Sequence, residues 1–228
     1  NKKYFFITGL PRSGNTLLSS LLNQNPDITA TGNSIVPEIL YRLEEIKKTK
    51  VYKNFPDQKS LDNINENVFK NYFKHLKTKY IIDRGPWGSE YNFEMLNKYL
   101  NDKIKIIVLV RSIPEILMSF INLANNNSNF YLNKSFNELV RSETWRDKIE
   151  QKCRILMRED HAIDKGLYEI KYLLDNVNNK NYKIFEYDDS VYGGPLHTIT
   201  TKSIVKEKRK VLDKILQRYS NMEFWRDN

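Results

Sequence analysis

Cysteine and long apolar runs are the two features that this sequence most clearly lacks. The only cysteine, Cys153, excludes an internal disulfide framework and is typical of a reducing compartment. No stretch of about 18 consecutive apolar residues occurs, so the sequence predicts no membrane-spanning segment. The first residues show no signal-peptide pattern, although the sequence begins without an initiating methionine. From these absences we expect a cytoplasmic protein.

Basic residues outnumber acidic ones, but a clustered basic stripe is also lacking. Lys and Arg total 37 against 28 Asp and Glu, which gives a formal net charge of +9. A surplus of this size attracts anions such as a nucleotide, an acidic or sulfated acceptor, or a membrane surface. The densest basic segment, 202–210, is short and most other charges are mixed with acids, so we expect no nucleic-acid partner.

Short apolar runs alternate with segments of helical periodicity, which is typical of an α/β fold. The run 104–110, composed of Ile, Val, Leu and one Lys, favours a strand buried on both faces of a parallel sheet. The polar segment 54–63 contains Pro56 and predicts a loop. We expect one three-layer domain, 1–228, in which a central parallel sheet is flanked by helices. Strands are expected at 4–8, 80–83, 104–110 and 182–187, and helices at 15–23, 38–48, 64–76, 93–100, 113–123, 202–219 and, in two or three pieces, 135–176.

A glycine-rich loop, residues 9–16, separates the first predicted strand from the first predicted helix. Its sequence is Gly-Leu-Pro-Arg-Ser-Gly-Asn-Thr. Glycines let successive backbone N–H groups converge on a phosphate, and the start of the helix adds positive charge. Nucleotide hydrolases carry a lysine where this loop has Asn15, and the strand 104–110 is followed by Arg111 rather than by a metal-binding acid. Both features argue against ATP–Mg²⁺ chemistry, while Arg12 supplies a permanent, fork-shaped cation for a phosphate or sulfate.

A second candidate site follows the strand 104–110. Arg111 leaves the carboxyl end of this strand, which is the edge where open parallel sheets bind ligands. Ser119 lies about two turns along the next helix and can face the same ligand. The alternative is that Arg111 only forms a salt bridge and that Ser119 faces solvent or a neighbouring helix.

Together the two motifs resemble those of the PAPS-dependent sulfotransferases. The loop 9–16 is similar to their 5′-phosphosulfate loop, most closely to the Pro-Arg-Ser-Gly-Thr-Thr of the tyrosylprotein and glycan sulfotransferases, from which Asn15 departs. The strand followed by Arg111 and Ser119 is similar to their 3′-phosphate site, with Arg-Ser-Ile-Pro in place of the usual Arg-Asp-Pro. The resemblance implies a P-loop-type fold without a metal. It also implies a set of residues that bind PAPS or its product PAP: Pro11, Arg12, Ser13, Gly14, Asn15, Thr16, Arg111 and Ser119.

The segment Asp83-Arg84-Gly85-Pro86-Trp87 resembles the Asp-Lys-x-Pro of the same family, in which the Lys lies near the transferred sulfuryl group. Arg84 would take the place of this Lys and, with Arg12, stabilise the negative charge that develops on the leaving oxygen. Arginine has a larger head group than lysine and keeps its proton. The alternative is a structural turn with an Asp83–Arg84 pair on the surface.

Sulfuryl transfer also needs a base that accepts the proton of the attacking group. In the tyrosylprotein branch a Glu precedes a Pro-x-Ile-Leu segment, but the residues 31–34 that precede Pro37 contain no acid. The base of the family therefore cannot be assigned by resemblance. By position, Glu38 is the first candidate, followed by Asp83 and Glu90.

The last part of the chain falls where the family has a loop over the nucleotide. His197 and Lys202 are candidate nucleotide contacts there, and a solvated basic helix face is the alternative. The other histidines, His75 and His161, are expected to lie on the surface or to be structural.

The sequence thus predicts an enzyme that transfers a sulfuryl group from PAPS to a hydroxyl or amine and releases PAP. The sequence does not distinguish between three classes of acceptor: a small molecule, a glycan and a protein side chain. Two alternatives stay open: a small-molecule kinase with an unusual P-loop, and a non-catalytic nucleotide-binding protein of the same fold. The non-catalytic alternative stays open because the catalytic base of the family has no counterpart in this sequence.

Overall fold

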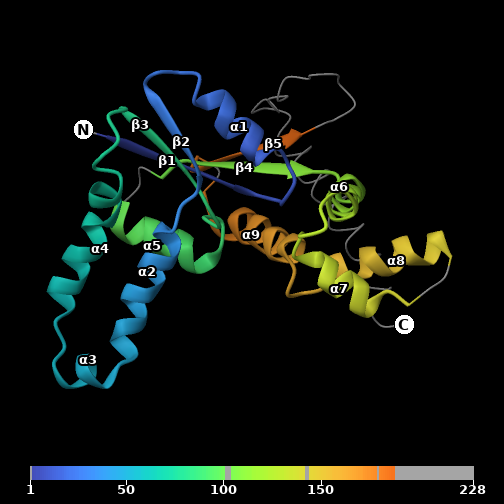
Figure 1. Cartoon of the computed structure of the whole chain (residues 1–228). Helices are drawn as coiled ribbons and strands as arrows, with labels where there is room; N and C mark the ends of the chain where they lie inside the picture. The colour runs from blue at the N-terminus through green and yellow to red at the C-terminus, as the bar shows by residue number, and fades with distance from the viewer. Residues whose placement is uncertain (1, 101–103, 142–143, 179, 188–228) are drawn as a thin grey trace. The chain divides into compact units, whose positions relative to one another are not determined.

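Strands and helices alternate along the chain in the computed structural model (Figure 1), which describes residues 2–100, 104–141, 144–178 and 180–187. The strands are β1 (Lys3–Gly9), β2 (Ile28–Asn33), β3 (Tyr80–Arg84), β4 (Ile106–Arg111) and β5 (Tyr182–Tyr187). The helices are α1 (Asn15–Leu22), α2 (Val36–Glu45), the 3₁₀ turn η1 (Ile46–Lys48), α3 (Lys50–Asn54), α4 (Gln58–Tyr72), α5 (Glu90–Leu100), α6 (Ile113–Asn126), α7 (Leu132–Leu139), α8 (Trp145–Leu156) and α9 (Ala162–Asn176).

The strands form one sheet in the order β2-β3-β1-β4-β5. Strand β1 lies in the middle and runs parallel to β3 and β4, while β2 runs parallel to β3. In β4, Val108 and Leu109 are fully buried although they point to opposite faces of the sheet, as the apolar run predicted. The predicted α/β fold with a central parallel sheet is therefore confirmed.

Helices cover both faces of this sheet. Alternate residues of β1 share one face, and the ring of Phe6 packs on it 5.0 Å from Trp87 and 5.7 Å from Phe69 of α4. Thr8, two residues further along β1, meets Glu169 of α9 on the same face. Helix α1 lies on the opposite side of the strands (Figure 1). The three-layer arrangement predicted from the sequence is present.

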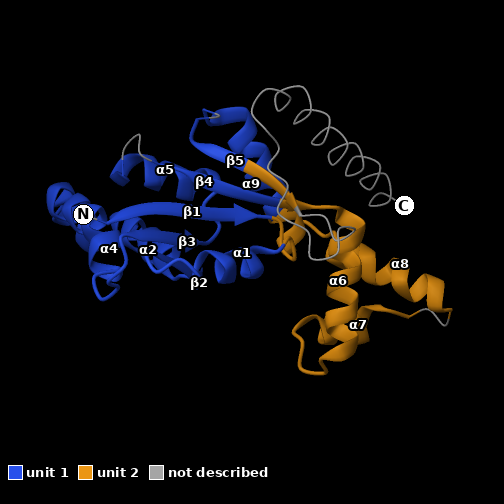
Figure 2. Ribbon diagram, turned by 90° about the horizontal axis from the view of Figure 1, so that it is seen from above, with its two compact units in different colours: residues 1–9, 14–109, 166–183 blue, residues 10–13, 110–165, 184–228 orange. Residues whose placement is uncertain are grey.

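The chain divides into two compact units, coloured separately in Figure 2. Unit 1 holds most of the sheet with α1 to α5 and the larger part of α9, and unit 2 holds the tip of the glycine-rich loop with α6, α7 and α8. The prediction of a single domain, 1–228, stays a prediction. Unit 1 comprises residues 1–9, 14–109 and 166–183, and unit 2 comprises 10–13, 110–165 and 184–228.

Four local predictions were wrong. Strand β2 was missed because its Thr- and Gly-containing sequence has only one buried apolar side chain, that of Ala30. The predicted loop 54–63 is mostly helical, since α4 begins at Gln58 and Asp57 caps it by accepting a hydrogen bond from the backbone N–H of Ser60. The predicted helix 64–76 ends early, because α4 stops at Tyr72. Four leucines lie on one face of the predicted helix 15–23, but this face is not all buried in α1, because two of them, Leu17 and Leu21, are about half exposed. The predicted helix 202–219 lies outside the described residues.

Candidate functional site

The glycine-rich loop 9–16 adopts backbone angles that few residues other than glycine reach. Gly9 has a φ of +133°, and a Cβ placed on it would lie 2.0 Å from the carbonyl oxygen of Leu109 on the neighbouring strand. Gly14 has a φ of 83° and precedes α1 as its cap, without a side chain that could cover the helix start. Arg12 is held at a φ of 59°, the left-handed region that costs a non-glycine residue energy. This loop shape and the open start of α1 are the features that anion-binding loops require.

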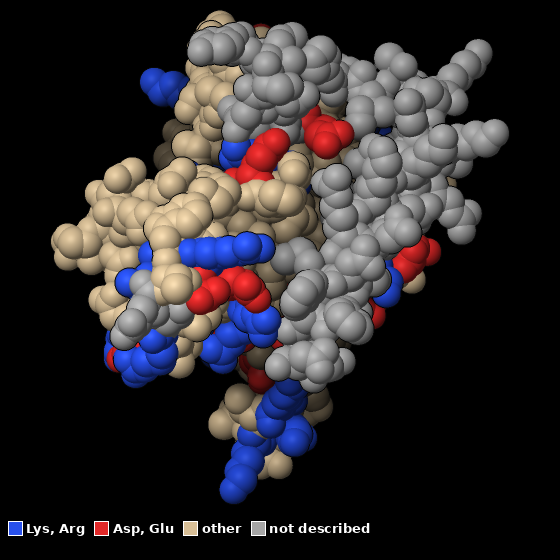
Figure 3. Space-filling view, turned by 90° about the vertical axis from the view of Figure 1, so that its right-hand side faces the viewer, with Lys and Arg blue, Asp and Glu red and all other residues tan. Residues whose placement is uncertain are grey.

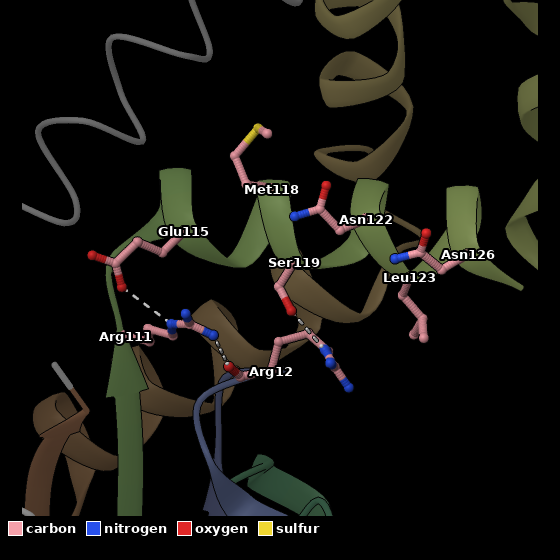
Figure 4. Close-up of a pocket in the computed structure, with 8 residues that line it drawn as sticks. All are labelled: Arg12, Arg111, Glu115, Met118, Ser119, Asn122, Leu123 and Asn126. Carbon is pink, nitrogen blue, oxygen red and sulfur yellow. Dashed lines mark hydrogen bonds and ion pairs between the residues drawn. The ribbon is translucent and has the colours of Figure 1, made fainter. Parts of the chain in front are cut away.

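Three residues predicted to bind the donor, Arg12, Arg111 and Ser119, meet in unit 2 (Figure 4). Arg111 Nη1 donates a hydrogen bond to the backbone carbonyl of Arg12 at 2.9 Å. Arg12 Nε in turn donates to Ser119 Oγ at 3.0 Å. Helix α6 therefore brings Ser119 back over the loop, two turns after Arg111, as the eight-residue spacing predicted.

These residues line a pocket of about 500 Å³ along α6. Two guanidinium groups, a hydroxyl and the carboxylate of Glu115 stand at one end, and amide and apolar side chains follow along successive turns of the helix (Figure 4). Such a cation pair with a hydroxyl donor matches a doubly charged phosphate. The lining residues are Arg12, Arg111, Glu115, Met118, Ser119, Asn122, Leu123 and Asn126.

Arg111 is also part of a salt bridge. Its Nε lies 3.1 Å from Glu115 Oε2, one turn along α6. One alternative from the sequence was that Arg111 only forms a salt bridge. The structure shows this salt bridge, but the same guanidinium also donates a hydrogen bond to the carbonyl of Arg12. Arg111 is consequently fixed by α6 on one side and by the loop on the other.

A second group of predicted residues meets in unit 1. Arg84, at the end of β3, donates from Nη1 to Thr16 Oγ1 at 3.0 Å. Arg84 is half-buried, and this burial lowers its pKa, although a guanidinium remains charged at neutral pH. The resemblance predicted that Arg84 and Thr16 serve the same end of the donor, and the structure brings the two side chains together.

Asp83 is fully buried and so does not form the surface pair with Arg84 that was considered as an alternative. Its two carboxyl oxygens accept hydrogen bonds from the hydroxyls of Thr31 and Ser34, each at 2.7 Å. Burial raises the pKa of Asp83 from 3.8 to about 6, and the hydrogen bonds from Ser34 and Thr31 limit this rise. Asp83 is therefore a carboxyl group that titrates near neutral pH.

The other predicted acids and histidines lie in ordinary surroundings. Glu38 is exposed and forms an ion pair with Arg42 on the next turn of α2, with 2.7 Å between Oε1 and Nε. Glu90 Oε2 accepts a hydrogen bond of 3.4 Å from the hydroxyl of Tyr168. His75 is exposed, whereas His161 is buried with its ring 5.2 Å from that of Phe120, as expected for a surface and a structural histidine. His197 and Lys202 lie outside the described residues, so their predicted contacts stay predictions.

One buried acid was missed in the sequence. Glu169 of α9 is 8% exposed and accepts a hydrogen bond of 2.6 Å from Thr8 Oγ1, at the residue before the loop, and another from the backbone N–H of Gly88. Burial raises its pKa from 4.5 to about 7. Its burial could have been predicted from the helical spacing of residues 166, 169 and 173, which places all three on one face of the helix. In the structure Gly166, Glu169 and Leu173 are all buried. Glu169 thereby ties α9 to the end of β1.

Replacing Glu169 by Gln should change how stability depends on pH. Because the folded protein holds the proton of Glu169 up to about pH 7, this group stabilises the fold fully below pH 4.5 and loses that contribution as the pH rises through 7. The variant cannot titrate, so its free energy of unfolding relative to wild type should rise by about 2.5 kcal/mol between pH 5 and pH 8. Urea denaturation across this range measures the difference.

The exposed Glu66→Gln on α4 is the matched control for this titration. This variant keeps Glu169, so its free energy of unfolding relative to wild type should not show that rise between pH 5 and pH 8. A curve for Glu169→Gln that also runs parallel to wild type would show that Glu169 titrates like an exposed acid, against the prediction.

The described residues contain neither a metal-binding cluster nor a membrane-spanning helix. No group of three or more His, Cys, Asp or Glu side chains in that part of the chain could hold a metal ion. Within the same residues no helix is long and apolar enough to cross a membrane.

Comparison with known proteins places the two motifs in a family. Residues 5–173 match the model of the sulfotransferase family. A curated relative, the ATP synthase subunit delta of Wigglesworthia glossinidia brevipalpis, is 31% identical over 173 residues, which are 69% of this chain and 88% of that protein.

Two solved structures are similar to this chain at low identity. One is the sulfotransferase domain of the Synechococcus PCC 7002 olefin synthase, with a TM-score of 0.47 and 18% identity over 95% of this chain and 73% of that one. The other is a sulfotransferase from Alicyclobacillus acidocaldarius, with a TM-score of 0.49 and 13% identity over 97% and 95% of the two chains.

Family membership rests on the family model and on the residues that it spans. The matched segment begins in β1, contains the whole loop 9–16 and continues through Arg84, Arg111 and Ser119 into α9. It thus includes both the glycine-rich loop and the arginine pair of the pocket along α6. The chain belongs to the sulfotransferase family.

Proposed function

We propose that this protein transfers a sulfuryl group from PAPS to a hydroxyl or amine and releases PAP. The observation that carries the proposal is the convergence of Arg12, Arg111 and Ser119 in one pocket at the end of β4. PAPS differs from ordinary nucleotides in its ribose 3′-phosphate. Two permanent cations and a hydroxyl are the groups that bind such a dianion in a fixed orientation.

The loop residues and Arg84 serve the reacting end of the donor in this proposal. The backbone of the loop, with Ser13, Gly14, Asn15 and the start of α1, holds the 5′-phosphate. The acceptor oxygen or nitrogen attacks sulfur, and the bond from sulfur to the bridging oxygen breaks. Arg84, already hydrogen-bonded to Thr16, stabilises the negative charge that this oxygen gains as it leaves with PAP. No metal takes part in this scheme.

The acceptor gives up a proton in this step, and Asp83 is the carboxyl group that we propose to receive it. A pKa of about 6 suits a base that works near neutral pH. Because Asp83 is fully buried, the proton reaches it through the hydroxyl of Ser34, which is only partly buried and donates to Asp83 at 2.7 Å. Glu38, the first candidate by sequence position, is less suitable because its carboxylate is already paired with Arg42 in solvent.

The acceptor belongs to one of three classes: a small molecule, a glycan or a protein side chain. We further propose that residues 1–228 act as one domain and that the protein works in the cytoplasm, as its single cysteine suggests. Two other functions compete with this proposal. A small-molecule kinase would bind ATP–Mg²⁺ rather than PAP, and a non-catalytic member of the family would bind PAP without any transfer.

A thermal-shift titration with PAP, AMP and ATP–Mg²⁺ tests the donor. At about 100 times its dissociation constant PAP stabilises the fold by about 2.7 kcal/mol, which corresponds to a rise in Tm of roughly 5–10 °C. AMP, which lacks the 3′-phosphate, should give a clearly smaller rise at the same concentration. Transfer of ³⁵S from labelled PAPS to a panel of acceptors then tests catalysis. A larger shift with ATP–Mg²⁺ than with PAP would instead support the kinase, and a shift with PAP without transfer would support the binding protein.

A further inference from the structure

In unit 1 the helices α2, α3 and α4 form an arm whose far end combines exposed apolar side chains with lysines. Helices α2 and α4 run side by side away from the sheet, and η1 and α3 join their far ends (Figure 1). At the sheet end of this arm Phe69 and Phe73 are buried. We call the opposite end, residues 46–59, the lysine tip.

Two apolar side chains of the lysine tip face solvent. Val51 is 73% exposed and Phe55 is 78% exposed. Phe55 directly follows α3, and its backbone N–H donates to the carbonyl of Val51 at 2.9 Å, so the two exposed residues lie one helical turn apart. Thr49 fixes this short helix by accepting a hydrogen bond from the backbone N–H of Tyr52. A capped helix thus holds two apolar groups out in water.

Lysines surround these two side chains. The lysine tip contains five lysines and one acid, Asp57, whose carboxylate is engaged as the cap of α4. In Figure 3 the blue side chains gather at the lower end of the molecule, where the arm ends. Two of the lysines pair with glutamates one turn earlier, and for the other three the described residues provide no carboxylate partner. The paired lysines are Lys47 and Lys48, and the others are Lys50, Lys53 and Lys59.

This combination of groups fits the surface of a lipid bilayer. Exposed apolar side chains on a projecting turn can enter the boundary between headgroups and acyl chains, where no shaped pocket is needed. Lysines beside them remain among the headgroups, and each is attracted to anionic lipids. A bilayer accepts both projecting apolar groups without a matching shape, whereas a folded acidic partner would need pockets fitted to them. We propose that the lysine tip docks this protein on membranes that contain anionic lipids, an inference that does not depend on the proposed donor or acceptor.

Vesicle flotation with the full chain tests the docking. Wild type should float with vesicles that contain phosphatidylserine, much less with pure phosphatidylcholine vesicles, and less at high salt because the lysine attraction is screened. Val51→Ser with Phe55→Ser should weaken binding to the anionic vesicles by roughly tenfold or more. Lys50→Glu with Lys53→Glu should have a similar effect.

Trp145→Ser with Lys148→Glu on α8 is the matched control, because it removes an exposed apolar group and reverses a lysine elsewhere. This control should float like wild type. All these positions are exposed, so unchanged circular dichroism and Tm are expected for each variant. Wild type that ignores anionic vesicles, tip variants that float like wild type, or binding to soluble polyglutamate without binding to vesicles would each overturn the proposal.

Discussion

Replacing Arg111 by alanine is expected to remove most of the preference for 3′-phosphorylated nucleotides. Each charge-assisted hydrogen bond to a phosphate contributes about 1.5–3 kcal/mol, and the guanidinium of Arg111 faces the pocket with two of its nitrogens already placed by Glu115 and by the loop. Binding of PAP should therefore weaken by about 10²–10³-fold, while binding of AMP should change far less. Isothermal titration with both nucleotides measures the two effects.

Arg154→Ala is the matched control for this experiment. Arg154 also pairs with a glutamate four residues away, with 2.8 Å between its Nη2 and Glu150 Oε1, but it lies on α8 and does not line the pocket. It should leave binding of both nucleotides unchanged. If Arg111→Ala weakens PAP and AMP by the same factor, Arg111 acts by holding the Arg12 carbonyl in the loop, and its assignment to the 3′-phosphate is wrong.

Gly9→Ala is expected to prevent stable folding. The new Cβ would lie 2.0 Å from the carbonyl oxygen of Leu109 and 2.6 Å from its nitrogen, both backbone atoms that cannot rotate away. β1 and β4 would have to separate at the centre of the sheet, and the φ of +133° adds backbone strain. We expect a loss of more than about 4 kcal/mol, seen as an insoluble protein or as urea denaturation with a much lower midpoint.

Gly32→Ala provides the comparison, because a Cβ at this position of β2 meets nothing within 4 Å. Its effect on stability should stay within about 0.5 kcal/mol, as for other exposed substitutions. Equal stability of the two variants would mean that β1 and β4 do not approach each other at Gly9 as described.

Local patterns in the sequence were enough to predict the central strands, the glycine-rich loop and the helix that follows β4. The apolar run of β4 has to be buried on both faces wherever it lies, and the loop 9–16 carries its glycines where the backbone needs them. The placement of Arg111 and Ser119 along one pocket, about two helical turns apart, follows from helical geometry once the helix is recognised. These features depend on neighbours close in sequence, and for that reason they were predicted.

Other features depend on residues far apart in the sequence. The sequence of β2 is mostly polar, and it forms a strand because it can pair with the free edge of β3. Asp83 and Glu169 titrate near neutral pH only because the fold buries them beside Ser34 and Thr8, 49 and 161 residues away.

The sequence by itself thus determined the α/β class and the glycine-rich loop, and it supplied the residues that we propose to bind the donor. Only the tertiary structure decided which acids are buried and which arginines share a pocket. The physical reason is that burial and electrostatic environment are set by long-range packing, which no local pattern of residues encodes.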